Sequence, residues 1–170
     1  EMWHAENIYE IPISFFKDND IEAVIFDLDN TLDPPLTKEA SKRTIEKIEE
    51  LKKNGLFVAI VSNNTKKRIE RYVTNLNIDG YIYGAKKPSP KKLNSFIEER
   101  KLDKNKTVMV GDQLFTDKQV AEKCQIKFIL TNRLSNKEVP WTYFNRIREM
   151  FVRKKLMRKG KLGNSIKKED

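Results

Sequence analysis

The sequence contains very little cysteine and no long apolar run. Cys124 is the only cysteine among the 170 residues, which excludes a disulfide within the chain and is typical of a reducing cytoplasm. No run of about 18 apolar residues occurs, so the sequence predicts no membrane-spanning helix. The first residues are neither basic nor followed by an apolar stretch, and they do not resemble a signal peptide. We expect a cytoplasmic protein in which Cys124 is a small buried residue.

Negative charge is scarce in the last part of the chain. Residues 141–170 contain ten Lys or Arg against three Asp or Glu, which gives +7 of the overall charge of +9. Residues 1–140 are therefore almost neutral. The length predicts one folded domain over residues 1–140, followed by a basic segment over residues 141–170. Basic segments of this kind bind phosphate groups of nucleic acids or of a membrane surface.

Short apolar runs alternate with helical patterns along the predicted domain. Five runs have the length of strands: residues 23–26, 56–61, 81–83, 107–110 and 128–130. The first helix is predicted to have Thr37 as its N-cap and to stop at Gly55, and the last to run from Asp117 to Cys124. Continuously apolar strands separated by amphipathic helices indicate a parallel sheet covered on both faces. The predicted fold class is α/β, a Rossmann-like, doubly wound parallel sheet in a three-layer α/β/α sandwich.

The pattern changes after residue 140. Four apolar residues recur there at helical spacing, namely Trp141, Phe144, Ile147 and Phe151. Basic residues lie between and beside them. An amphipathic basic helix is predicted, packed on the domain or extending from it, with residues 161–170 frayed. His4 lies far from every motif in the sequence, and we expect it at the surface.

Polar side chains follow four of the predicted strands. Residues 27–32 follow the first strand, 62–64 the second and 111–113 the fourth, while Lys87 lies in the loop after the third. Because ligands of open α/β sheets bind at the carboxyl ends of the strands, we expect these groups to meet on one rim. Each group by itself is also typical of an ordinary turn or helix cap. Their joint occurrence, in this order, predicts a functional site.

The residue types on this rim indicate phosphoryl transfer. A carboxylate such as that of Asp27 can attack phosphorus and form an aspartyl-phosphate. Carboxylate and phosphate repel each other, and a divalent cation between them removes that obstacle. Magnesium prefers oxygen ligands, which Asp27 and Asp112 supply from neighbouring strand ends, with Asp117 orienting a water outside the direct ligands.

The remaining predicted site residues handle protons and phosphate oxygens. Asp29, two residues beyond Asp27, is placed to protonate the leaving oxygen and later to activate water. Ser62, Thr31 and loop N–H groups are predicted to hold the phosphate oxygens, and Lys87 to add a positive charge.

The sequence resembles the haloacid dehalogenase superfamily at all four of its motifs. Residues 27–32 match the signature D-x-D-x-T-L, Ser62 the second motif, Lys87 the third, and Asp112 with Asp117 the acidic fourth. The resemblance implies a magnesium-dependent phosphatase with Asp27 as nucleophile and Asp29 as acid and base. It also implies a phosphate contact from Asn63 and a metal contact from the backbone carbonyl of Asp29.

More narrowly, residues 61–64, 87–88 and 111–114 resemble the YqeG-type subfamily, class IIIA. The gaps between Leu32 and Phe57 and between Asn64 and Lys87 hold no cap domain, so we expect an open active-site mouth. An open mouth suits a phosphate carried by something large. YqeG-type proteins are similar to phosphatidylglycerophosphate phosphatases, which makes a phosphorylated lipid the preferred substrate and an anionic membrane surface a partner for the basic helix.

Two alternatives remain open. The first keeps the chemistry and changes the substrate to a phosphoprotein, a nucleic-acid end or a soluble phosphate. The second is an RNA-binding or assembly factor with a vestigial phosphatase site, which the intact Asp27, Asp29, Lys87 and Asp112 disfavour. Nucleic acid is therefore the less favoured partner, and peripheral attachment at the inner face of the membrane the favoured location.

Overall fold

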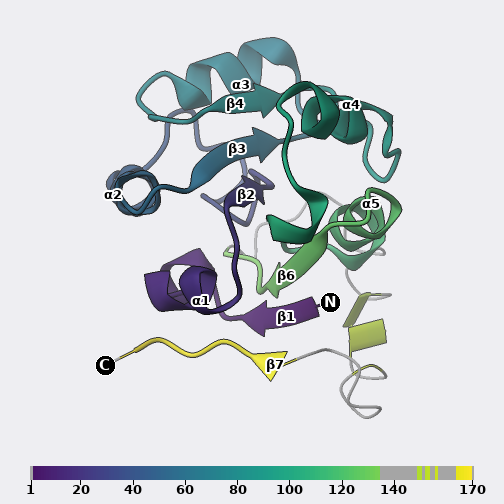
Figure 1. Ribbon diagram of the computed structural model, residues 1–170. Helices are drawn as coiled ribbons and strands as arrows, with labels where there is room; N and C mark the ends of the chain where they lie inside the picture. Colours follow the sequence, from purple (N-terminus) through teal and green to yellow (C-terminus); the bar gives the residue numbers. More distant parts are fainter. Residues whose placement is uncertain (1, 135–148, 151, 154–155, 157–163, 170) are drawn as a thin grey trace.

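The protein is built around one parallel β-sheet (Figure 1). The computed structural model describes residues 2–134, 149, 150, 152, 153, 156 and 164–169. Its strands are β1 (Met2–Ala5), β2 (Ala23–Phe26), β3 (Phe57–Val61), β4 (Gly80–Ile82), β5 (Thr107–Gly111), β6 (Lys127–Thr131) and β7 (Asn164–Ser165). They are ordered β4-β3-β2-β5-β6-β1-β7, and every pair is parallel. The predicted parallel sheet is confirmed.

Helices cover both faces of the sheet. They are α1 (Ile13–Asp18), α2 (Lys42–Lys53), α3 (Lys66–Val73), α4 (Lys91–Glu99) and α5 (Gln119–Lys123), with shorter helical turns η1 (Ile8–Glu10), η2 (Lys104–Lys106) and η3 (Leu114–Lys118). Successive side chains of a strand point to opposite faces. Val24 therefore packs in the cluster that holds Ile48 of α2, while Ile25 packs in the cluster that holds Leu93 of α4. The three-layer sandwich is thus as predicted, with α1–α3 on one face and α4 and α5 on the other (Figure 1).

The two ends of the chain add strands that the sequence did not predict. β1 pairs with β6, and β7 pairs with β1, with a further bond from the Ile166 N–H to the His4 carbonyl at 2.6 Å. The expectation that residues 161–170 are frayed was therefore wrong for Asn164–Ser165. Strands of four and two residues are too short for the spacing of their apolar side chains to indicate a strand, and β7 has no apolar residue.

Helix boundaries differ from the prediction in two places. The N-cap of α2 is Ser41, whose hydroxyl accepts from the Thr44 N–H, so the prediction of Thr37 was wrong. The helix expected from Asp117 to Cys124 begins earlier, at Leu114 of η3, and continues through α5 to Lys123, with Cys124 as its C-cap. Cys124 is fully buried, as expected. Trp141, Phe144, Ile147 and Phe151 of the predicted basic helix lie outside the described residues.

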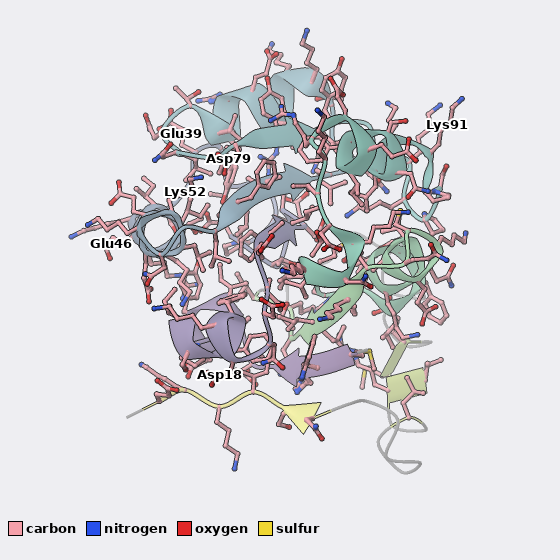
Figure 2. The ribbon with its side chains drawn as sticks, in the orientation of Figure 1. Asp18, Glu39, Glu46, Lys52, Asp79 and Lys91 are labelled. Carbon is pink, nitrogen blue, oxygen red and sulfur yellow. The ribbon has the colours of Figure 1, made fainter. Side chains whose placement is uncertain are left out.

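An ion pair lies at the end of the sheet where the strands begin, opposite their carboxyl ends. Lys52 near the end of α2 and Asp79 just before β4 point toward each other (Figure 2). Lys52 Nζ lies 2.5 Å from Oδ2 of Asp79, which also accepts from the Val58 N–H at 2.8 Å. The pair joins α2 to β3 and β4. The polar loops of the predicted site lie at the opposite edge, after the carboxyl ends of the strands. Within the described residues, no helix has the length and apolar character needed to cross a membrane.

Candidate active site

Asp27 stands where β2 ends and the chain turns. Its N–H still donates to the Val110 carbonyl at 2.9 Å, so the backbone of Asp27 continues the ladder with β5. The turn follows at Asn30, which has a φ of 65° and donates its N–H to the Asp33 carbonyl. Asparagine tolerates this left-handed conformation better than most residues. The turn leaves Thr31 fully buried beside Asp27.

Three carboxylates from two strand ends form a buried cluster. Ligand atoms of Asp27, Asp112 and Asp117 all lie within 4.8 Å of one another. Thr31 lies between two of them, with Oγ1 at 3.3 Å from Oδ2 of Asp27 and 3.4 Å from Oδ1 of Asp112. The sequence expectation that these four residues meet on one rim is therefore confirmed as geometry.

Lys87 closes the cluster from the loop after β4. Its Nζ donates to Oδ1 of Asp27 at 2.6 Å and to Oδ1 of Asp117 at 2.7 Å. Burial by itself would lower the pKa of Lys87, but the neighbouring carboxylates of Asp117 and Asp27 outweigh it and raise that pKa above its ordinary value. The ammonium group of Lys87 therefore stays protonated and positively charged at neutral pH.

The cluster brings like charges close together. Three carboxylates share a buried space, and the ammonium group of Lys87 is bonded to two of them. Burial, and then repulsion by Asp27, raise the pKa of Asp117 to about 6 despite the opposing effect of Lys87. A divalent cation among them would reduce the repulsion between the carboxylates, and carboxylate oxygens are the ligands that magnesium prefers. The residues present therefore fit a bound magnesium ion.

Asp29 turns toward α3. Its Oδ2 accepts from Nδ2 of Asn64 at 2.6 Å, and its Oδ1 from Nη2 of Arg68 at 2.9 Å. Burial raises the pKa of this carboxyl, the hydrogen bond from Asn64 and the charge of Arg68 lower it, and Asp27 raises it, so that the net shift is upward. A carboxyl group with a raised pKa in such a position can exchange a proton during a reaction.

Residues after β3 support the loops on the rim. The Ser62 hydroxyl accepts from the N–H and from Nδ2 of Asn64, at 3.1 and 3.0 Å. Asn63 bonds both backbone groups of Lys87, accepting from its N–H at 2.8 Å and donating to its carbonyl at 3.2 Å. Ser62 is buried at the end of β3, which pairs with β2. The side chain of Asn63 fixes the backbone of the loop that carries Lys87.

Sequence reasoning missed two groups of the rim. Arg68 was not predicted, although it follows the second motif within the first turn of α3 and only the phase of that helix directs it to Asp29. Asp33 was also missed. This buried carboxylate accepts from the Tyr72 hydroxyl at 2.5 Å, the Thr44 hydroxyl at 3.0 Å and the Ser41 N–H at 3.1 Å, and it fixes the loop between β2 and α2.

Comparison with known sequences identifies the family. The profile of the haloacid dehalogenase-like hydrolases matches residues 36–131. A curated relative, the probable phosphatase YqeG of Bacillus subtilis (strain 168), is 35% identical over 156 residues, which cover 92% of this chain and 90% of the relative.

Solved structures show the same fold. One is an uncharacterized protein from Listeria monocytogenes serotype 4b, with a TM-score of 0.55 and 24% identity over 71% of this chain and 85% of that one. Another is the 3-deoxy-D-manno-octulosonate 8-phosphate phosphatase of Moraxella catarrhalis in complex with magnesium, phosphate and sugar acid. Its TM-score is 0.52 and its identity 16%, over 84% of this chain and 92% of that one. The chain belongs to the haloacid dehalogenase-like hydrolases, as a phosphatase similar to YqeG.

Proposed function

We propose that the protein is a magnesium-dependent phosphomonoester hydrolase that acts through an aspartyl-phosphate on Asp27. The observation that carries this proposal is the meeting of Asp27, Asp112 and Asp117 within 4.8 Å, with Lys87 bonded to two of them. Magnesium would be held by Asp27, Asp112 and the carbonyl of Asp29, with Asp117 acting next to them. When bound, it would neutralise the carboxylates and the phosphoryl oxygens.

The reaction has two displacements. A carboxylate oxygen of Asp27 forms a bond to phosphorus while the bond from phosphorus to the leaving oxygen breaks, and Asp29 gives that oxygen a proton. Water then attacks phosphorus, Asp29 takes the proton back, and the bond between phosphorus and Asp27 breaks. Thr31, Ser62 and Lys87 hold the phosphoryl oxygens. Asn63 contributes by fixing the backbone of Lys87.

The rim around the cluster supports a large anionic substrate. The first turns of α2, α3 and α4 contain no acidic residue and begin with Lys42, Lys66 and Lys91. Cations at helix amino termini oppose the helix dipole, so this placement does not serve helix stability and adds to the positive potential of the rim. Leu36, on the loop between β2 and α2, is 87% exposed. An exposed apolar side chain on the loop that leads to the basic first turn of α2 suits a lipid surface.

We therefore propose a phosphorylated lipid such as phosphatidylglycerophosphate as the substrate. Phosphate release from vesicles containing it should require magnesium, cease with EDTA and cease in Asp27→Asn. Binding to anionic vesicles should weaken about 30-fold in Lys66→Gln/Lys67→Gln, since each of the two basic residues near such a surface contributes roughly 1 kcal/mol. The control Lys53→Gln/Lys101→Gln removes the same charge at the opposite edge of the sheet.

The outcomes separate the substrate from the chemistry. Magnesium-dependent turnover of soluble phosphate esters, with no vesicle binding, would retain the phosphatase and reject the lipid. Tight RNA binding that weakens steeply with salt, without any turnover, would reject the proposed function as a whole.

A further inference from the structure

The described part of the C-terminal segment contacts the strand ends that carry the acidic cluster. Arg153 donates from Nη2 to the carbonyl of Asp112 at 2.7 Å and to the carbonyl of Thr131 at 3.3 Å. Its Nη1 donates to Oδ1 of Asn132 at 3.2 Å. Asp112 directly follows β5, and Thr131 is the last residue of β6. One guanidinium group therefore joins the ends of two neighbouring strands.

Glu149 makes a second contact, one helical turn earlier. Its Oε1 accepts from the Phe115 N–H at 3.5 Å, and the residue is only 4% exposed. The described residues from 149 to 153 have helical backbone, so Glu149 and Arg153 lie on one side of it. Val152 and Leu156 pack against the apolar cluster that β5 and β6 share with α4 and α5. The segment is thus seated on the domain at this point.

Both contacts lie on the segment from Asp112 to Asp117, which carries two of the three carboxylates. It is tightly wound, since a Cβ on Gly111 would lie 2.5 Å from Cβ of Asp117. From inside, the Gln113 N–H donates to Oδ2 of Asp117 at 3.1 Å. From outside, Arg153 holds the carbonyl of Asp112. The positions of both carboxylates follow the backbone that these bonds fix.

We propose that Arg153 is a positioning residue of the metal site, which keeps Asp112 and Asp117 at the spacing from Asp27 that a divalent cation requires. This inference rests on the proposed function, because it presupposes that the cluster holds magnesium. Residues that orient metal ligands typically change metal affinity 10-fold to 100-fold when they are replaced. Arg153 accordingly serves the active site, a role that the basic character of residues 141–170 does not indicate by itself.

The direction of the effect separates positioning from other roles. A positive charge beside the carboxylates repels a divalent cation, so a role through charge alone predicts tighter magnesium binding when Arg153 is removed. A role in fold stability alone predicts a lower melting temperature with unchanged magnesium affinity. Positioning predicts weaker magnesium binding, because the carboxylates lose their spacing.

The experiment measures magnesium affinity of the full chain from the rise in melting temperature with magnesium concentration and from calorimetric titration. Arg153→Ala should raise the half-saturating concentration about 10-fold, with a much smaller change in kcat at saturating magnesium. Arg153→Lys should fall between this variant and the unchanged protein, because lysine keeps a donor but lacks the fork. Lys168→Ala is the matched control, as it removes an exposed charge from the same segment.

Unchanged or tighter magnesium binding in Arg153→Ala would overturn the inference. If that variant does not fold, Arg153→Lys decides, and an affinity equal to that of the unchanged protein overturns the inference. A failure of the proposed function gives a different result. In that case magnesium would not raise the melting temperature of the protein without substitutions, or it would raise that of Asp112→Asn equally.

Discussion

Arg68 holds the carboxylate of Asp29 through a hydrogen bond of 2.9 Å from Nη2 to Oδ1. The bond joins the first turn of α3 to the loop after β2, and Asn64 donates to the other oxygen of the same carboxylate at 2.6 Å. Both donors come from the segment that follows β3. The orientation of the proposed acid and base is therefore set by the amino-terminal turn of a neighbouring helix.

Loss of Arg68 should impair proton transfer selectively. Arg68→Ala frees the Asp29 carboxyl, and we expect about a 10-fold lower kcat/KM for esters of weakly acidic alcohols, which need a proton on the leaving oxygen. Esters of acidic phenols need none and should lose far less. Steady-state rates with both kinds of ester measure the difference. Arg71→Ala, an exposed position on the same helix, is the control, and equal losses with both esters would contradict the role of Asp29.

The negative charge of the acidic cluster should destabilise the metal-free protein. Asp112→Asn reduces the repulsion among the three carboxylates, and we expect the melting temperature of the metal-free protein to rise by a few degrees, corresponding to about 1 kcal/mol. Differential scanning calorimetry measures this, and the rise that magnesium causes should disappear in the same variant. Asp18→Asn, an exposed carboxylate, is the control (Figure 2). A lower melting temperature with an intact magnesium response would argue against the cluster as the metal site.

Magnesium binding should weaken below pH 6. The pKa of Asp117 is raised to about 6, mainly by burial, so the folded protein binds a proton there that the unfolded chain does not bind until its ordinary pKa of 3.8. The contribution of this group to the stability of the metal-free protein is therefore greatest at low pH and falls as the pH rises through 6.

Magnesium competes with this proton, so the magnesium concentration for half saturation should be about 10-fold higher at one pH unit below the pKa of Asp117. Titrations at pH 7.5 and pH 5 measure the change. In Asp117→Asn the pH dependence in this range should vanish. Equal affinities of the unchanged protein at both pH values would show that Asp117 does not interact with the metal.

The bond from Tyr72 to Asp33 should be important for stability. Tyr72→Phe removes one of the three donors to the buried Asp33 carboxylate, at 2.5 Å, and a hydrogen bond to a charged group contributes about 1.5–3 kcal/mol. Denaturant unfolding should show this loss. Tyr81→Phe, whose hydroxyl lies 3.4 Å from Glu70 at the surface, should cost less than about 0.5 kcal/mol. Similar values for the two variants would contradict the role of Asp33 in fixing the loop.

The fold and most of the rim could be predicted because buried parallel strands are continuously apolar. Two apolar runs are followed directly by polar residues, Asp27 and Ser62. The topology of a parallel sheet brings such strand ends together. The two-residue strand β7 could not be predicted, because its pairing depends on the position of β1 and on no pattern of its own.

The roles of residues that act through tertiary contacts could not be predicted from the sequence for a different reason. Arg153 has the same chemical character as the basic residues around it, and only its bond to the Asp112 carbonyl distinguishes it. The phosphate contact implied for Asn63 stays a prediction, while the bonds from its side chain to the backbone of Lys87 are a tertiary contact that no residue type or spacing could have indicated.

The most direct test of the central claim is to trap the phosphoryl group during the first turnover. Protein, magnesium and an acidic aryl phosphate are mixed, quenched in acid and digested, and the peptides are analysed by mass spectrometry. The account predicts a phosphoryl group on Asp27 that is absent in Asp27→Asn and in the presence of EDTA. A phosphoryl group on another residue, or unchanged turnover by Asp27→Asn, would contradict it.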